Sequence, residues 1–236
     1  MGSGSTTTPA PGRPYAPYYL LAALLGAHVV ANIIWLALDQ HVIRIDELFH
    51  ARGAREFFRA FYMQDYATWG EWGAALLEIR SPYPPLLHVL AAGVATVLGY
   101  SQDTLSFTST LIFVALLLGV FTLSRVWLTP WGALLATAIV SLTPSLYGGS
   151  RHLAQDYLAA ALVVWAIYAL VRSECFSRWR WAVLFGVLNG LGLVARQITP
   201  LYLIVPAAIC ALAGLYLAGQ HLRHGQGYAT LTRVVT

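Results

Sequence analysis

Residues 18–38, Tyr18-Tyr-Leu-Leu-Ala-Ala-Leu-Leu-Gly-Ala-His-Val-Val-Ala-Asn-Ile-Ile-Trp-Leu-Ala-Leu38, form an apolar block without a charged side chain. A helix needs about 20 consecutive, mainly apolar residues to cross the ~30 Å hydrocarbon core of a bilayer. The block is too long for the core of a signal peptide and has no small-residue cleavage site. It therefore predicts a retained transmembrane helix.

Further apolar blocks follow along the chain, at residues 84–100, 105–127, 131–147, 152–171, 180–196 and 200–219. Hydrophobic residues make up 58% of the sequence and charged residues 10%, whereas a soluble domain carries about a quarter charged residues. The fold class that this predicts is an all-α polytopic membrane protein, a bundle of transmembrane helices. The net charge of +4 comes from arginines scattered between the blocks, and nucleic-acid binding would need them clustered on one polar face. We therefore expect a lipid bilayer and no nucleic acid as partner.

The placement of arginine indicates how many blocks cross the membrane, because short cytoplasmic loops carry an excess of positive charge. The block at 84–100 opens with Pro84-Pro85 and is short. If this block lies half-inserted and the N-terminus is cytoplasmic, only Arg151 and Arg196 remain in short outer loops. The arginines that become cytoplasmic are Arg13, Arg125, Arg172, Arg178, Arg180, Arg223 and Arg233. We therefore predict six crossings, with seven as the alternative.

This topology divides the chain into three parts. Residues 1–14 are rich in Gly, Ser, Thr and Pro and are expected to be disordered. Residues 15–219 form the membrane module, with a long first outer loop at 39–83, and residues 220–236 form a tail. Cys175 falls in a loop and Cys210 in an apolar block, so we expect that they do not meet and form no disulfide.

The first outer loop contains two candidate helices. Residues 46–62 place aromatic side chains on one face and arginines on another, which is typical of a helix that lies on the membrane surface. A second helix is expected at 68–79. Asp46 and Glu47 stand in the first turn of the first helix, where acids favour the helix dipole. Their position just past the first transmembrane helix makes them candidate catalytic acids as well.

Asp156 and Arg196 are charged residues at the edges of later apolar blocks. A carboxylate about one turn into a membrane helix costs on the order of 2.5–3.5 kcal/mol on insertion scales, so it normally faces a partner or a polar cavity. For Asp156 that partner can be His152 or Arg151, or the acid can be functional. Arg196 can be a membrane-surface anchor or a phosphate ligand, because a guanidinium binds phosphate oxygens bidentately.

The predicted topology brings these separate signals to one face of the membrane. The residues on that face are Asp46, Glu47, Arg80, the helix start at Pro84, Arg151, Asp156 and Arg196. Carboxylates can activate an acceptor hydroxyl as general bases. Arginines and a free helix N-terminus can hold an anionic phosphate. The set favours group transfer from a phosphate-linked donor at the membrane surface.

Four segments resemble, in order, segments of the GT-C glycosyltransferase superfamily, closest to the protein O-mannosyltransferase-like and lipid A aminoarabinose-transferase-like enzymes (family 39-like). They are Arg44-Ile-Asp-Glu-Leu-Phe-His50, Ser81-Pro-Tyr-Pro-Pro-Leu-Leu-His88, Ser150-Arg-His-Leu-Ala-Gln-Asp156 and Gly190-Leu-Gly-Leu-Val-Ala-Arg196. The resemblance covers residues 18–219 and implies a GT-C-type helix bundle. It departs from the family at Tyr83, where members often carry a cation. Members are also usually longer, so we expect an N-terminal module whose tail leads to further spans.

The resemblance implies an inverting transfer of a hexose or pentose from a polyprenyl-phosphate donor. The acceptor would be a lipid, glycan or protein, at the outer face of a prokaryotic plasma membrane. By the same resemblance, Asp46 would be the general base, Glu47 would support it and Asp156 would be a second acid. Donor phosphate contacts would come from Arg196, Arg151 and Arg80.

We expect no cofactor. His41, His50, His88 and His152 can lie near the acids, but no pair has the close spacing of a dedicated metal site, so a divalent metal is the less favoured alternative. Two other classes of function stay open. A transporter subunit could use Asp156 and Arg196 in a translocation path, and a non-catalytic fragment would leave the outer acids without a role.

Overall fold

The computed structural model describes residues 15–39, 45–62, 66–79 and 81–223. All regular elements in these ranges are helices. They are α1 (Ala16–Leu38), α2 (Ile45–Tyr62), α3 (Trp69–Glu78), α4 (Leu86–Leu98), α5 (Gln102–Ser124), α6 (Pro130–Ser141), α7 (Pro144–Gly149), α8 (Gln155–Arg172), α9 (Trp179–Ala195) and α10 (Leu201–Arg223). The predicted all-α membrane fold is confirmed. Residues 1–14 and 224–236, for which disorder and a tail were predicted, lie outside the described residues.

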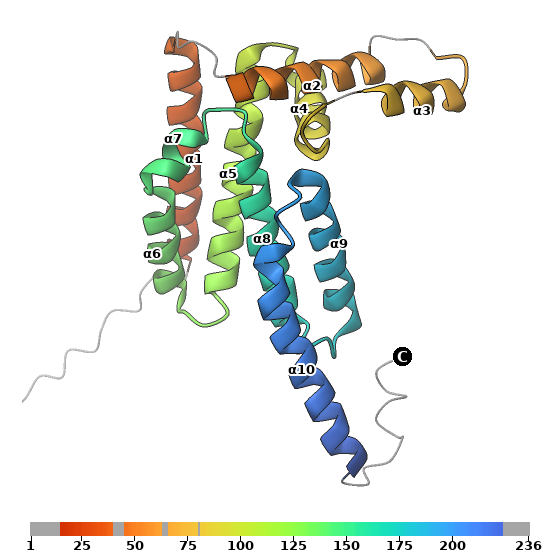
Figure 1. Cartoon of the computed structure of the whole chain (residues 1–236). Coiled ribbons are helices and arrows are strands. Elements are labelled where there is room, and N and C mark those ends of the chain that lie inside the picture. The colour runs from red at the N-terminus through yellow and green to blue at the C-terminus, as the bar shows by residue number, and fades with distance from the viewer. Residues whose placement is uncertain (1–14, 40–44, 63–65, 80, 224–236) are drawn as a thin grey trace, which may run out of the picture.

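The long apolar helices run along a common axis, whereas α2 and α3 lie across one end of the bundle (Figure 1). We call this the α2 end. Helix α1 begins at the opposite end, and α10 ends on that same opposite side (Figure 1). Four helices, α1, α5, α8 and α10, are long and apolar enough to cross a membrane by length and composition, while α6 and α9 are shorter. Six crossings therefore stay a prediction.

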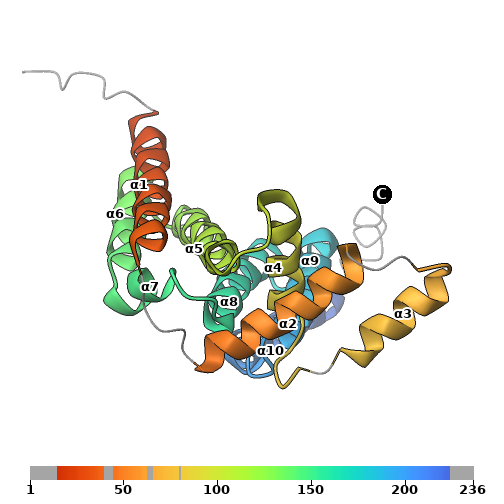
Figure 2. The ribbon, with the colours of Figure 1, turned by 90° about the horizontal axis from the view of Figure 1, so that it is seen from above.

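Helix α4 carries the block whose crossing was in question. It begins after Pro84-Pro85 and ends at Gly99, whose φ of 87° lies in the left-handed region that glycine tolerates. The helix has 13 residues, which give it a length of about 20 Å. Seen from above, it lies lengthwise over the bundle and under α2 (Figure 2). Helix α4 thus lies across the long apolar helices (Figure 2), and its interfacial placement stays a prediction.

The core of the bundle is centred on α5, which packs against α1, α4, α6 and α8. Its side chains Phe113 and Leu117 are fully buried. Side chains on the outer helices are instead exposed: Val205 and Ile209 of α10 have more than half of their surface accessible. Because these exposed positions are apolar, they suit a lipid environment in place of water.

The predicted block 131–147 is not one helix. Its first part forms α6 and its last part forms α7, with a break at Leu142-Thr143. Pro144 stands at the start of α7, where its missing N–H removes no helical hydrogen bond, whereas inside a longer helix it would remove one. The break bends the chain so that α7 lies at the α2 end (Figure 1).

The two cysteines correct one expectation. Both are free thiols, but the loop that holds Cys175 lies against α10, the helix that contains Cys210. The loop that holds Cys175 has positive φ angles at Glu174, Cys175 and Phe176, and it turns back onto α10. The two residues are therefore close together in the fold, although their spacing along the chain does not predict it.

Gly149 is required by the packing of α7 on α8. A Cβ atom at this position would lie 1.5 Å from the hydroxyl of Tyr157, which donates a hydrogen bond to the carbonyl of Ser145 at 2.7 Å.

We expect Gly149→Ala to lower the free energy of unfolding by about 1–3 kcal/mol, the usual cost of overpacking. Thermal unfolding in detergent, followed by tryptophan fluorescence, measures the change. Gly148→Ala is the matched control, because a Cβ there meets nothing within 4 Å. Equal melting temperatures for the two variants would refute this account of Gly149.

Candidate active site

Asp46 stands in the first turn of α2 and is exposed. Its Oδ1 atom accepts a hydrogen bond of 3.0 Å from the hydroxyl of Tyr83, which lies in the segment before α4. This hydrogen bond to the carboxylate is the main reason that the pKa of Tyr83 is raised above its usual value. The bond orients the carboxylate of Asp46 and ties the start of α2 to the segment before α4.

Glu47, the next residue, is buried, with 3% of its surface exposed. Its Oε1 atom lies 2.8 Å from Nδ1 of His152, which follows α7. A buried carboxylate needs such a partner, because an unpaired charge away from water is costly. The His152 ring also lies edge-on to Trp35 of α1, with ring centroids 5.6 Å apart. Glu47 thus joins three segments that are distant in sequence.

Asp156 stands in the first turn of α8 and forms an ion pair with Arg196, the residue that caps the C-terminal end of α9. Sequence reasoning offered His152 or Arg151 as its structural partner, and both were wrong. His152 pairs with Glu47, and Arg151 binds Asn32. The reason is geometric: residues 151–154 precede α8, so these side chains do not lie one helical turn below Asp156.

Arg151 is held from three sides. Its Nε donates to Oδ1 of Asn32 at 3.0 Å. Its guanidinium lies 5.1 Å from the ring centre of Trp35 and 4.2 Å from that of Tyr147, both within cation–π range. Asn32 is fully buried within α1, and its amide donates to the hydroxyls of Thr110 at 3.0 Å and Ser150 at 2.9 Å. Asn32 thereby fixes the start of the Arg151 segment against α1 and α5.

A second buried contact links α2 to α4. Nδ1 of His50 lies 3.1 Å from Nε2 of His88, and both rings are buried. Gly53 makes room for the His88 ring, since a Cβ there would lie 2.7 Å from its Nδ1. The ring of Tyr83 lies over His50, with centroids 4.4 Å apart. The pair thus supports the residue that binds Asp46.

Burial disfavours the charged form of both rings. It lowers the pKa of His50, against the raising effect of Asp46 and Glu47, and it lowers the pKa of His88 to about 4, with His50 adding to the effect. Both rings are therefore neutral at pH 7, which suits a hydrogen bond in which one nitrogen donates and the other accepts.

The histidine pair makes the protein sensitive to acid. A histidine whose pKa is about 4 when folded and 6.5 when unfolded binds fewer protons in the folded state, so stability falls as the pH drops from 6.5 towards 4. We expect the melting temperature of the wild type to decline over this range, and to decline less steeply in His88→Gln. Unfolding in detergent at pH 7.5, 6.0 and 4.5 measures both slopes. Parallel slopes would show that His88 does not contribute.

The predicted site residues thus come to the α2 end in pairs, with one exception. The contacts are Asp46 with Tyr83, Glu47 with His152, Asp156 with Arg196, and Arg151 with Asn32. Arg80, predicted as a phosphate ligand, lies outside the described residues. Among the residues that the structure describes, no three His, Cys, Asp or Glu side chains gather into a group that could hold a metal ion.

Three contacts of the candidate site were missed by sequence reasoning. Tyr83 was read as a departure from the family, although it is the partner of Asp46. The contact between His50 and His88 spans 38 residues, and nothing in their spacing indicates it. Asn32 did leave a signal, because an amide within an uninterrupted apolar block must find a hydrogen-bonding partner.

The fold and site define an all-α membrane protein in which acids pair with a histidine and an arginine at one end of the bundle. Residues 82–234 match the family model of the dolichyl-phosphate-mannose-protein mannosyltransferases, which are of the GT-C type. The chain belongs to this family and is a membrane glycosyltransferase of the mannosyltransferase type. No curated protein and no solved structure matches the chain. The match contains Arg151, Asp156 and Arg196, while Asp46 and Glu47 precede it.

Proposed function

We propose that the protein transfers a sugar from a polyprenyl-phosphate donor to an acceptor hydroxyl, with inversion at the anomeric carbon. The observation that carries the proposal is the convergence of Asp46, Glu47 and Asp156 at the α2 end. Glu47 contacts His152 across 105 positions of sequence, and Asp156 stands in the first turn of α8, the helix that follows His152. Family membership supports the transferase over a transporter, and the family's name supports a lipid-phosphate sugar as donor.

In the proposed reaction the acceptor oxygen attacks the anomeric carbon from the face opposite the phosphate. The new C–O bond forms as the bond from the anomeric carbon to the phosphate oxygen breaks. The polyprenyl phosphate leaves with the bonding electrons, and the acceptor proton passes to a carboxylate. Asp46 suits that role because it is exposed and because Tyr83 occupies only its Oδ1 atom.

The other predicted residues have supporting roles in this proposal. Glu47 is buried against His152, so it orients the α2 start and does not itself meet the acceptor. Asp156 is exposed and positions the acceptor or donor beside Arg196. Arg196, Arg151 and Arg80 would offset the charge that develops on the leaving phosphate.

Arginine placement supports an outer-face site. Arg125 and Arg178 stand in the connections after α5 and α8, and Arg172 is the last residue of α8, all at the end of the bundle opposite α2 (Figure 1). Since positive charge favours the cytoplasmic side, the α2 end would face outward.

The test is a transfer assay with labelled polyprenyl-phosphate sugars and membranes that contain the protein. We expect a product whose anomeric configuration is opposite to that of the donor, as read by NMR. We also expect Asp156→Asn to reduce the rate by about tenfold or more, since the variant loses the ion pair with Arg196. Glu174→Gln is the control, because it breaks an exposed pair with Arg178 far from the α2 end. Retained configuration, or equal rates in the two variants, would contradict the proposal.

A further inference from the structure

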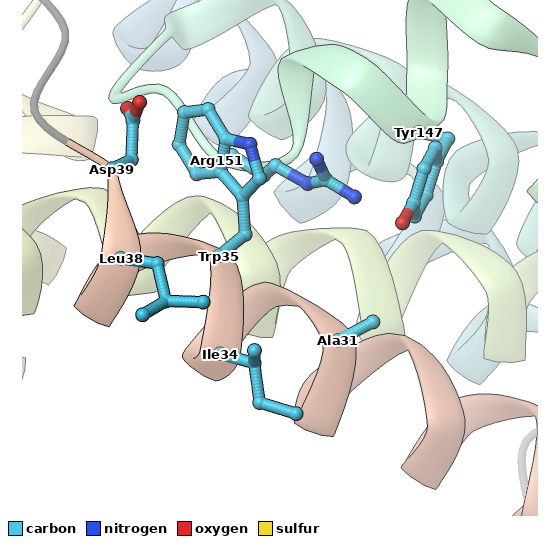
Figure 3. Close-up of a pocket in the computed structure, with 7 residues that line it drawn as sticks. All are labelled: Ala31, Ile34, Trp35, Leu38, Asp39, Tyr147 and Arg151. Atoms are coloured by element: carbon cyan, nitrogen blue, oxygen red, sulfur yellow. The ribbon is translucent and has the colours of Figure 1, made fainter.

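A groove of about 520 Å³ runs beside α1 near the α2 end. Its apolar wall consists of Ala31, Ile34 and Leu38, which follow one face of α1 (Figure 3). Ile34 and Leu38 are 53% and 76% exposed. Because α1 is long and apolar enough to cross a membrane and these side chains are exposed, the wall suits contact with lipid.

The polar part of the groove is the guanidinium of Arg151. Figure 3 shows it between the rings of Trp35 and Tyr147. Its Nε is bound by Asn32, but among the described residues no carboxylate pairs with it, and its terminal nitrogens have no hydrogen-bond partner. Arg196 differs, because its charge is already matched by Asp156. Of the predicted phosphate ligands that the structure describes, Arg151 is thus the one whose charge is available.

One acid also lines this groove. The carboxylate of Asp39 lies on the far side of the Trp35 indole from the guanidinium (Figure 3). The indole therefore separates the two charges, and the terminal nitrogens of Arg151 remain available to an anion at the edge of the guanidinium. Arg151 is fixed in place, but its charge is not neutralised. Such an arginine is pre-organised for a phosphate, because the planar guanidinium can bind two phosphate oxygens at once.

We propose that this groove is the binding site of the donor's lipid carrier. The phosphate of a polyprenyl phosphate binds Arg151, and the first prenyl units lie along Ala31, Ile34 and Leu38 of α1. The carrier reaches the groove sideways from the bilayer, between α1 and α7. This inference rests on the proposed function for the identity of the donor, and it assigns the carrier phosphate to Arg151 in preference to Arg196.

The groove continues towards the acids, which favours this assignment. A neighbouring pocket of about 470 Å³ shares Trp35 and Arg151 with the groove and is also lined by His152. His152 in turn binds Glu47, the neighbour of Asp46. A sugar attached to a phosphate at Arg151 would therefore extend towards the predicted general base, while the prenyl chain stays in the lipid.

The experiment measures binding without chemistry. A polyprenyl phosphate with a photoreactive diazirine in its first prenyl units, and without a sugar, is added to the full chain in phosphatidylcholine nanodiscs. After irradiation, the cross-linked peptide is mapped by mass spectrometry and the dissociation constant is taken from the yield. We expect cross-links on α1 around Ile34. We expect Arg151→Gln to weaken binding at least tenfold. Arg151→Lys should weaken it less, because lysine keeps the positive charge but cannot bind two phosphate oxygens in the bidentate way of a guanidinium.

Two further variants test the apolar wall independently of Arg151. Ile34→Trp fills the groove and should reduce the cross-linking yield several-fold. Ile33→Trp is its matched control, since Ile33 is similarly exposed but does not line the groove. Wild-type affinity in both Arg151→Gln and Ile34→Trp would overturn the proposal. Equal competition by phosphatidylglycerol and by unlabelled polyprenyl phosphate would also overturn it, because the groove would then bind any anionic lipid. Binding that persists in a protein without transferase activity would reject the proposed function and leave the groove assignment standing.

Discussion

Asp46→Asn is expected to slow sugar transfer by roughly 10²- to 10⁴-fold, the usual contribution of a general base. Asparagine has nearly the same shape, and its Oδ1 atom can still accept the hydrogen bond from Tyr83. The fold and the position of the side chain should therefore survive, while the ability to take the acceptor proton is lost. The measurement is the rate of transfer at saturating donor and acceptor, compared with wild type at equal protein level.

Asp103→Asn is the control for this substitution. Asp103 is an exposed acid in the first turn of α5, and the same chemical change there removes only a helix-terminal charge. We expect its rate to stay within about twofold of wild type. If Asp46→Asn instead raised KM and left kcat unchanged, Asp46 would bind substrate without acting as the base.

Asn32→Leu is expected to produce the largest loss of stability, roughly 2–4 kcal/mol in the free energy of unfolding. The substitution removes the hydrogen bonds to Thr110 and Ser150 and leaves Nε of Arg151 without its acceptor. Single hydrogen bonds between membrane helices average about 0.6 kcal/mol, and a bond to a charged group is worth about 1.5–3 kcal/mol. Denaturant unfolding in mixed micelles, monitored by tryptophan fluorescence, measures the loss.

Asn189→Leu is the matched control for Asn32→Leu. The carbonyl oxygen of Asn189 in α9 is buried without a hydrogen-bond partner, so leucine should be neutral or stabilising there. Removing an unsatisfied polar group costs nothing and can help. Similar losses in the two variants would mean that Asn32 is ordinary packing and not the anchor of Arg151.

The helices themselves could be predicted well, because each apolar block is long and bounded by clear signals. Thr68, for example, was predicted to open the second helix of the first loop, and it caps α3 by accepting from the N–H of Glu71. The amphipathic stretch from Asp46 became α2, with Asp46 and Glu47 in its first turn as expected. The break between α6 and α7 was missed, since Pro144 was read as lying inside a single block.

The residues of the candidate site could be predicted from the sequence, but the contacts between their side chains could not. Topology placed Asp46, Asp156 and Arg196 on one face without saying which side chains touch. The pairings depend on how α1, α2 and α8 are rotated about their axes, and no local pattern fixes those rotations. Asp156 illustrates this, since its partner Arg196 is 40 positions away and comes from the far end of another helix.

The position of the two outermost helices has a practical consequence for assays in cells. Helix α1 begins and α10 ends on the same side of the bundle, away from α2. Reporters fused ahead of α1 and after α10 should therefore share one compartment. The two halves of a split fluorescent protein, attached at those points, should therefore reassemble inside the cell. Labels added outside the same cell should react with the α2 end. Such a strain would report, in one culture and without purification, whether a variant inserts with its α2 end outward.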